Sequence, residues 1–190
     1  MPGIFSIIFF LLIFCVLYLF ANRSKKAALK GLSAFLTGSV SKFPFRPPTF
    51  IGGYQGFKLS VILVPADRYS PDFLHISLAK SSTFKLTIYK ESLLSNLGKR
   101  VGIVHEVKTN DEIFDKEFLT FSNRPAQAMA YLNNAGIKNA IRELFNNGFN
   151  AVSIGYRRIS IQKPECISGD LQPENLTPTL QKLSLLAGGL

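Results

Sequence analysis

Residues 4–21 form an apolar run, IFSIIFFLLIFCVLYLFA, with no charged side chain in its eighteen positions. As an α-helix this run would extend roughly 27 Å, which is close to the hydrocarbon thickness of a bilayer. The run is apolar on every side, whereas a helix that packs in the core of a globular domain is usually amphipathic. We therefore predict a retained transmembrane anchor over residues 1–21.

A cleaved signal peptide, a lipoprotein signal and a buried core helix are the alternatives to an anchor. A cleaved signal needs a basic N-terminal region and small residues at its exit. Residues 1–3 carry no basic side chain, and Leu19 lies two positions before the candidate exit at Ala21. A lipoprotein signal needs a small residue before its cysteine, but Phe14 precedes Cys15. These departures favour the anchor.

Basic residues follow the apolar run at once and predict its orientation. The four nearest are Arg23, Lys25, Lys26 and Lys30. Positive residues close to a span stay on the cytoplasmic side. We therefore predict a single-pass protein of the cell membrane with its N-terminus outside and its C-terminal domain in the cytoplasm. The same four side chains are the predicted contacts with the surface of the lipid bilayer.

The net charge of +10 is distributed unevenly along the chain. Residues 22–46 hold six basic and no acidic side chains, whereas residues 47–190 hold sixteen basic and twelve acidic ones. A basic segment beside anionic lipid gains up to about 1 kcal/mol per charge. Nucleic-acid binding would instead need basic residues interleaved with aromatic ones across the folded domain, so we do not expect a nucleic-acid partner.

Composition divides the rest of the chain into three predicted parts. Residues 22–48 form a basic juxtamembrane segment, in which an interfacial helix over 22–41 precedes the proline-rich link FPFRPP at 43–48. Residues 49–165 form a cytosolic domain, and about 115 residues suffice to bury a core. Residues 166–190 hold a loop and a short apolar helix.

Apolar and polar side chains alternate over several short segments, which predicts strands. The segments are residues 57–63, 74–78, 84–88, 101–107, 117–121, 152–154 and 159–161. Short connections favour an antiparallel meander, which the last two segments complete as a hairpin. Residues 125–148 have helical spacing, as one kinked helix or two short ones. After the transmembrane helix, we therefore predict an α+β fold: a mostly antiparallel sheet with one or two helices on one face.

Leucines of the C-terminal helix share one side of that helix. They are Leu176, Leu180, Leu183 and either Leu186 or Leu185. Such a stripe must lie against the sheet, another protein or the membrane surface. We predict that Leu176, Leu180, Leu183 and Leu186 dock a protein partner.

The sequence lacks the common motifs of catalytic and cofactor sites, namely GxxxxGK[ST], GxGxxG, GxSxG, HExxH and CxxC. Polar residues are densest between 105 and 117, where carboxylates could hold a hard cation. The spacing of an EF-hand is absent, so a solvated acidic loop is the simpler interpretation. We name His105, Asp111 and Asp115 as a candidate polar site and predict no cofactor or metal ion.

We also consider four residues outside that group as candidates for a reactive or binding role. His75 falls on the polar phase of a predicted strand, so we expect it on a sheet face. Cys166 lies in a turn-rich stretch, and we interpret it as an unreactive thiol. Arg157 and Arg158 lie at a predicted hairpin tip, where they could meet anionic lipid or an acidic partner.

Three stretches together resemble a pattern in uncharacterised prokaryotic single-span, membrane-anchored proteins. The stretches are TNDEIFDKEFLTFS, IRELFNNGFNAVSI and LTPTLQKLSLLAGGL. In the pattern, T-G-D-x-x-F-D-x-x-F enters a strand, and a helix, a strand and a leucine-rich terminal helix follow. Phe114 and Asp115 match its F-D pair, while Asn110 stands where glycine is common. The resemblance implies an anchored domain of this arrangement and no known activity.

These features predict a membrane-tethered cytosolic protein-interaction module, or an accessory subunit of a membrane complex, without catalysis. A ligand-binding or enzymatic domain with a site on the open sheet face is the alternative. Its polar residues would be His75, Thr87, Tyr89 and His105. A third hypothesis is a binder of lipid surfaces or nucleic acid that depends on basic charge.

Overall fold

The structure is a computed structural model of the 190-residue chain. It describes residues 9, 13, 23–41, 47–64, 72–90, 105–166 and 168–190. The predicted anchor therefore lies almost entirely outside the described residues, and so do residues 101–104 of the predicted strand over 101–107. Within the described part, no helix is both long and apolar enough to cross a membrane.

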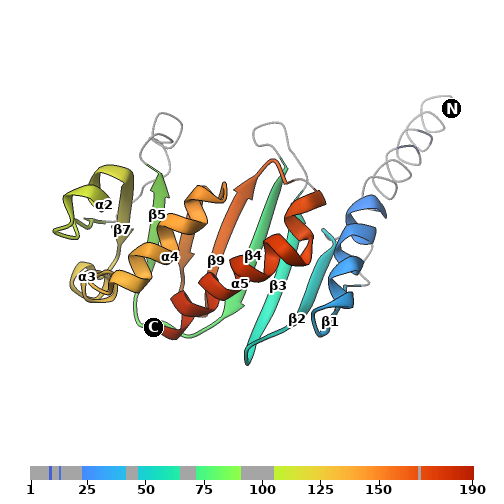
Figure 1. The fold of residues 1–190 in the computed structure, drawn as a ribbon, viewed down its shortest axis with the longest axis horizontal. Coiled ribbons are helices and arrows are strands. Elements are labelled where there is room, and N and C mark those ends of the chain that lie inside the picture. Colours follow the sequence, from blue (N-terminus) through green and yellow to red (C-terminus); the bar gives the residue numbers. More distant parts are fainter. Residues whose placement is uncertain are drawn as a thin grey trace, which may run out of the picture.

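The described residues form one nine-stranded sheet, in the order β1-β2-β3-β4-β9-β8-β5-β7-β6 (Figure 1). The strands are β1 Gly38–Val40, β2 Thr49–Tyr54, β3 Phe57–Val64, β4 Phe73–Ala79, β5 Leu86–Lys90, β6 His105–Glu106, β7 Phe118–Ser122, β8 Ala151–Ile154 and β9 Arg158–Pro164. Every neighbouring pair is antiparallel. The predicted antiparallel sheet and mixed α+β class are confirmed.

The hairpin of β8 and β9 lies in the middle of the sheet, between β4 and β5. The predicted meander order is therefore wrong, because β4 pairs with β9 and β5 pairs with β8. Alternation along a strand determines which face each residue occupies, but it does not determine which strand becomes the neighbour. The central hairpin thus joins β1–β4 to the group of β5, β6 and β7, all of which precede it in the sequence.

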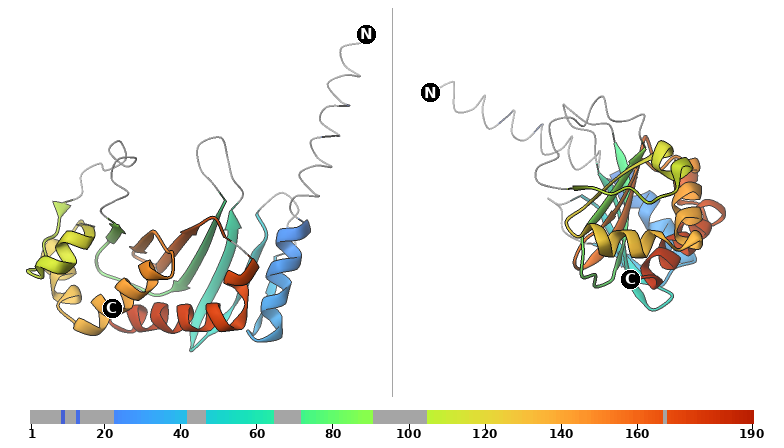
Figure 2. Two further views of the ribbon diagram at one scale, coloured as in Figure 1. Left: turned by 45° about the horizontal axis from the view of Figure 1, so that its top comes forward. Right: turned by 90° about the vertical axis from the view of Figure 1, so that its left-hand side faces the viewer.

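Helices cover one face of the sheet, and the other face carries none in the described structure (Figures 1 and 2). The helices are α2 Glu112–Glu117, α3 Pro125–Leu132, α4 Ala135–Asn146 and α5 Pro173–Gly188, with short 3₁₀ turns at Leu32–Ala34 and Ser168–Leu171. Residues 23–31 are also helical. The predicted helical region 125–148 is two helices, because Asn134 caps α4 by accepting a hydrogen bond from the Gly136 N–H.

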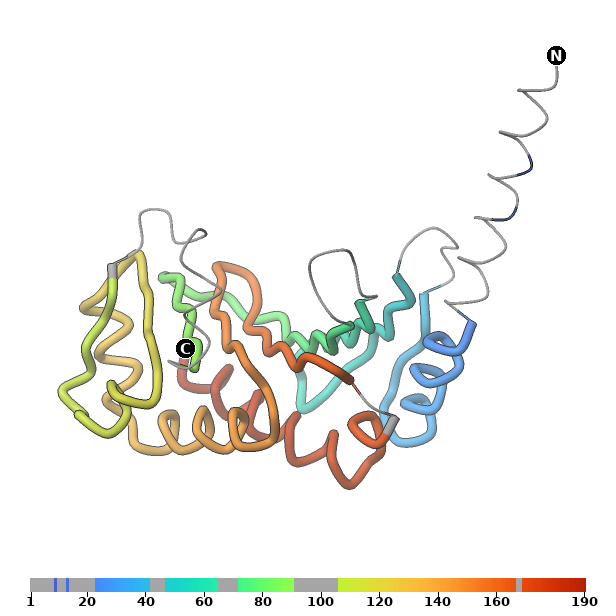
Figure 3. The backbone as a smooth tube through the Cα atoms, turned by 90° about the horizontal axis from the view of Figure 1, so that it is seen from above, coloured from blue at the N-terminus to red at the C-terminus, as the bar shows by residue number. Residues whose placement is uncertain are grey.

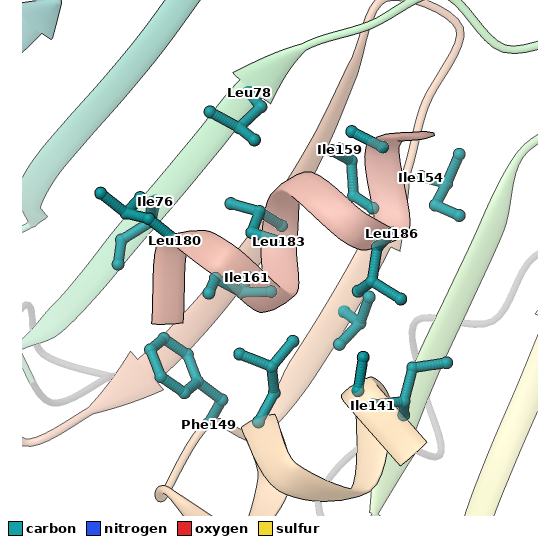
Figure 4. Packing of buried hydrophobic residues seen from close by; sticks show 14 of the residues in the cluster. Ile76, Leu78, Ile141, Phe149, Ile154, Ile159, Ile161, Leu180, Leu183 and Leu186 are labelled. Carbon is teal, nitrogen blue, oxygen red and sulfur yellow. The ribbon is translucent and has the colours of Figure 1, made fainter. Parts of the chain in front are cut away.

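The leucine stripe of α5 packs in the core of the chain itself, so the predicted docking surface is wrong. Its four leucines are at most 1% exposed; they are Leu176, Leu180, Leu183 and Leu186. Figure 4 shows the last three above the isoleucines of β4 and β9. The central strands turn an apolar face toward α5. The leucines of α5 cover that face, because this removes both apolar surfaces from water.

The segment before the proline-rich link also belongs to this core. Leu29 and Leu32 are fully buried, and Leu36 is 9% exposed. The chain then enters the sheet, where β1 pairs with β2 through Gly38 and Gly52. The predicted boundary at residue 48 therefore needs correction: residues 23–40 are part of the folded body, because their apolar side has the sheet to pack against (Figure 3).

Candidate functional site

On the sheet face away from the helices, the strand register aligns hydroxyl side chains into one row. The row crosses five neighbouring strands, β3, β4, β9, β8 and β5. Its members, each paired with the next, are Ser60, Ser77, Ser160, Ser153 and Thr87. The residues before and after each member are buried in the core, which places these five on the opposite face. Neighbouring strands lie about 4.8 Å apart, so the row extends roughly 19 Å.

The hydroxyl row has unused hydrogen-bonding capacity. Ser77 and Ser160 are only 7% and 9% exposed. Yet none of the five hydroxyls has a hydrogen-bond partner within the described part of the chain. A hydroxyl can both donate and accept hydrogen bonds, so the row offers both functions to any group that lies along it.

A row of basic residues runs beside the hydroxyl row, two positions away along each strand. Ala79 pairs with Arg158. Extending the neighbouring registers by one residue places Lys58 beside Ala79 and Gly155 between Arg158 and Lys85. The three cations are therefore on alternate strands, separated by the two smallest residue types. We call Lys58, Arg158 and Lys85 the face cations.

The face cations are exposed and carry uncompensated charge. Among the described residues, none of them has a carboxylate within ion-pair distance. The Lys85 ammonium lies 4.9 Å from the centre of the Tyr156 ring, a contact that leaves its charge in place. The helix-free face is therefore positively charged along one line and rich in hydroxyls along the next.

His75 lies in the row on the other side of the hydroxyls. That row is Ile62, His75, Gln162, Ala151 and Tyr89. The His75 Nε2 atom is buried and has no hydrogen-bond partner among the described residues. Burial, and after it the positive charge of Arg158, lowers the pKa of His75 below its ordinary value. A neutral imidazole at the sheet centre adds a polar group without adding charge.

The structure brings together part of the site that the alternative hypothesis predicted on the open face. His75, Thr87 and Tyr89 lie on this face, although three strand spacings separate His75 from Tyr89. His105 pairs with Ser122, whereas Thr87 pairs with Phe121. His105 therefore does not join the row of Thr87.

Two members of the predicted polar site of His105, Asp111 and Asp115 make local structural contacts; they are Asp111 and Asp115. Asp111 caps α2 by accepting a hydrogen bond from the Phe114 N–H at 3.0 Å. That bond and the Lys138 ammonium at 3.0 Å lower the pKa of Asp111. Asp115 accepts hydrogen bonds from the N–H and hydroxyl of Thr109. Within the described residues, no three His, Cys, Asp or Glu side chains are grouped to hold a metal ion.

Three of the four predicted membrane-surface residues project into solvent from the helix over 23–31; they are Arg23, Lys26 and Lys30. We call these three the collar cations. Lys25 differs, because its ammonium lies 3.3 Å from a carboxylate oxygen of Asp72 and its side chain is 19% exposed. Lys25 therefore links this helix to Asp72, the residue directly before β4.

A cavity of about 390 Å³ lies where α4 ends and α5 begins, a size that suits a small molecule. The Lys163 ammonium, which lines it, donates a hydrogen bond to Asp170 at 2.6 Å and lies 6.0 Å from the centre of the Phe149 ring. Lys163 is the single basic residue of the lining. Because Asp170 compensates that charge, the cavity is a weaker candidate than the helix-free face.

Cys166 lines a smaller cavity of about 90 Å³ together with Lys25 and Asp72. Burial, followed by the negative charge of Asp170, raises the pKa of the Cys166 thiol to about 11. A thiol with this pKa is protonated at neutral pH and is a poor nucleophile. This agrees with the interpretation of Cys166 as an unreactive thiol.

The face cations were not predicted as a group from the sequence, although the sequence contains a short motif that marks them. Three strands carry a basic residue, an apolar residue and a hydroxyl residue in succession: Lys58–Ser60, Lys85–Thr87 and Arg158–Ser160. The first and third members of such a triplet share one sheet face. Only the strand register shows that the three triplets lie on alternate strands of the sheet, in the same phase.

One solved structure has a similar fold. The crystal structure of the mycobacterial trehalose monomycolate transport factor A, TtfA, aligns with a TM-score of 0.60 over 89% of this chain and 93% of that chain, at 9% sequence identity. No family model and no curated protein matches the sequence. At this identity the likeness concerns the fold alone.

Proposed function

We propose that this protein is a membrane-tethered binding module whose folded body lies in the cytoplasm beside the bilayer. The observation that carries the proposal is the two-sided helix over residues 23–31, directly after the apolar run. Its collar cations project into solvent, while Leu29 is buried in the core of the body. The helix is thus suited to meet anionic headgroups on one side and to hold the body on the other.

This attachment differs from a flexible tether. A linker rich in glycine and serine would let the body move freely over a large volume. Here the residues next to the apolar run are helical, pack into the core and form an ion pair with Asp72. The body would therefore keep one orientation relative to the bilayer, which favours a fixed place in a membrane complex.

We further propose that the protein acts as an accessory subunit with a protein partner. TtfA, the protein of similar fold, is a transport factor, and an accessory role in membrane transport is one form of our proposal. The leucine stripe is unavailable for docking, because it is buried in the core. The helix-free sheet face also supports the second candidate function, a ligand-binding domain, since its hydroxyls lack partners within the described residues.

Topology is tested with a reporter fused after Leu190 in the full-length protein. We expect cytoplasmic reporter activity, and we expect the triple variant R23Q/K26Q/K30Q to weaken this orientation, because positive residues beside a span retain it in the cytoplasm. The matched control is K58Q/K85Q/R158Q, which removes the same charge far from the apolar run and should leave the orientation unchanged. External reporter activity in the intact protein would overturn the proposed orientation.

The accessory role is tested by extracting tagged full-length protein in a mild detergent and identifying copurifying chains by mass spectrometry. We expect at least one membrane protein at a stoichiometric level. Recovery of the protein alone, with the reporter still cytoplasmic, would contradict the accessory role and leave the tether intact. The same preparation then serves to test ligand binding.

A further inference from the structure

We propose that the helix-free sheet face binds an elongated ligand that carries several phosphate groups. The site consists of three pairs, each made of one face cation and one hydroxyl: Lys58 with Ser60, Arg158 with Ser160, and Lys85 with Thr87. This proposal goes beyond the tether and the accessory role, because it concerns a different surface of the body.

Each pair has the two groups that a phosphate recognises. The members lie two positions apart in β3 and β9, and Lys85 lies one residue before β5. In extended backbone they share a face, and their Cα atoms are separated by roughly 6.7 Å. The long basic side chain can lean toward the hydroxyl, and a phosphate between them would meet one positive charge and one O–H donor. Hydrogen bonds to an ionised acceptor are about twice as strong as neutral ones.

The spacing of the pairs sets the length of the ligand. Strand β4 lies between β3 and β9, and strand β8 lies between β9 and β5. Successive pairs are therefore two strand spacings apart, or about 9.6 Å. The intervening strands contribute Ala79 and Gly155 to the basic row and Ser77 and Ser153 to the hydroxyl row. These intervening side chains are small and project little from the sheet, so we infer that one extended ligand can meet all three pairs.

The charge of the face favours an anionic ligand over a neutral one. Ser77 and Ser160 are more than nine-tenths buried and supply hydroxyl donors, and His75 adds a buried Nε2 atom that no described residue contacts with a hydrogen bond. These groups alone would also suit a neutral polar ligand. The face cations decide between the two classes, because none of the three has a carboxylate partner within the described structure.

The position of the face cations favours a soluble phosphate-bearing ligand over lipid of the same bilayer. Lys58 follows the β2–β3 turn, and Arg158 follows the β8–β9 turn. In Figures 1 and 2 the helix over residues 23–31 begins at the opposite end of the strands from the β2–β3 turn. The collar cations and the face cations therefore form two separate basic surfaces.

The test uses full-length protein in uncharged maltoside micelles, titrated by calorimetry with inorganic polyphosphate and with inorganic phosphate. We expect polyphosphate to bind, inorganic phosphate to bind at least about 100-fold more weakly because it meets one pair at a time, and affinity to fall as salt is added. Micelles containing short-chain phosphatidylglycerol form the lipid arm. Phosphatidylglycerol binding that needs the face cations, without polyphosphate binding, would assign the same phosphate chemistry to a lipid headgroup.

Two charge-matched triple variants make the result specific. We expect K58Q/K85Q/R158Q to reduce polyphosphate affinity at least tenfold and R23Q/K26Q/K30Q to leave it unchanged. Equal losses in both would overturn the site in favour of general charge attraction. A third variant, S60A/T87V/S160A, should weaken binding severalfold at an unchanged unfolding midpoint, and no change would contradict the paired arrangement. If polyphosphate does not bind but the reporter is cytoplasmic, the ligand site is refuted and the proposed membrane tether is unaffected.

Discussion

The two faces of the sheet are built from the same strands and differ in what their side chains do. On the helix-covered face, Ile76 and Ile161 are paired, fully buried and lie under α5. One residue further along, Ser77 and Ser160 are also paired. Within the described residues no helix covers them, and their hydroxyls have no hydrogen-bond partner. One phase of each strand thus builds the core, and the other phase carries the residues of the proposed ligand site. Substitutions on the two faces should therefore separate stability from ligand affinity.

The largest loss of stability is expected on the covered face, in α5. Leu180 and Leu183 are fully buried against the sheet. Each change to alanine should lower the free energy of unfolding by about 2–5 kcal/mol, because it leaves a cavity in the core. The measurement is denaturant unfolding of the full-length protein in maltoside micelles, followed by near-ultraviolet circular dichroism of its tyrosines. Leu185→Ala is the control, since Leu185 is 49% exposed on the same helix. Equal effects at Leu185 and Leu183 would refute the packing described for α5.

A smaller loss is expected at the sheet edge, where β1 and β2 approach closely. A methyl group on Gly52 would collide with the Thr37 carbonyl oxygen and the Phe50 ring, whereas the nearest atom to one on Gly53 is 3.9 Å away. Gly52→Ala should therefore cost about 1–3 kcal/mol through overpacking. Gly53→Ala, measured by the same unfolding experiment, should cost clearly less. The reverse order would mean that β1 does not pair with β2 as described.

These glycines also show why strands β1 and β2 were not predicted from the sequence. Alternation in Phe57–Val64 and Phe73–Ala79 predicted two strands correctly, because every second residue of each strand is apolar and buried in the core. Thr49–Tyr54 contains two glycines, and Gly38–Val40 has only three residues, so neither shows a clear period. Their pairing depends on close backbone approach, which local pattern does not encode.

The candidate site on the helix-free face was not predicted as a whole for a related reason. Alternation predicted that His75 would lie on a sheet face and that polar residues of the strands would share the face away from the core. The hydroxyl row and the face cations emerge only when β9 and β8 are inserted between β4 and β5. That insertion joins segments distant in sequence, so no local pattern predicts it.

Valine substitutions at two threonines on the helix-covered side should change the free energy of unfolding in opposite directions, each by about 1 kcal/mol. Thr120 is 1% exposed, and its hydroxyl has no hydrogen-bond partner in the part of the chain that the structure describes. The Thr179 hydroxyl instead donates a hydrogen bond to the Asn175 carbonyl at 2.9 Å. Thr120→Val should raise the free energy of unfolding by about 1 kcal/mol, and Thr179→Val should lower it by a similar amount. A loss at both positions would show that Thr120 has a partner in solution.

On the helix-free face, Ser77→Ala should change stability by less than about 0.5 kcal/mol, since the lost hydroxyl has no partner within the described residues. Ile76→Ala on the same strand should cost several times more, because Ile76 is fully buried. Both are measured by denaturant unfolding. A cost at Ser77 as large as that at Ile76 would contradict the division of roles between the faces.

The smallest effect concerns pH and His75. Its pKa is lower in the folded protein than the ordinary value, because burial and Arg158 disfavour the charged imidazole. As pH falls below about 6.5, the unfolded chain takes up a proton that the folded protein resists, so stability declines with falling pH. His75→Gln should therefore flatten the dependence of the unfolding midpoint on pH between neutral and mildly acidic conditions. Parallel profiles for the two proteins would rule out this role of His75.

The central claim, that the helix-free face binds ligand while the covered face stabilises the fold, is tested most directly by mapping amide chemical shifts. Labelled full-length protein in maltoside micelles is titrated with inorganic polyphosphate. The account predicts shifts at residues 58–60, 85–87 and 158–160 and no comparable shifts in α4 or α5. Shifts concentrated at the collar cations or around the Lys163 cavity, or the absence of shifts, would contradict it.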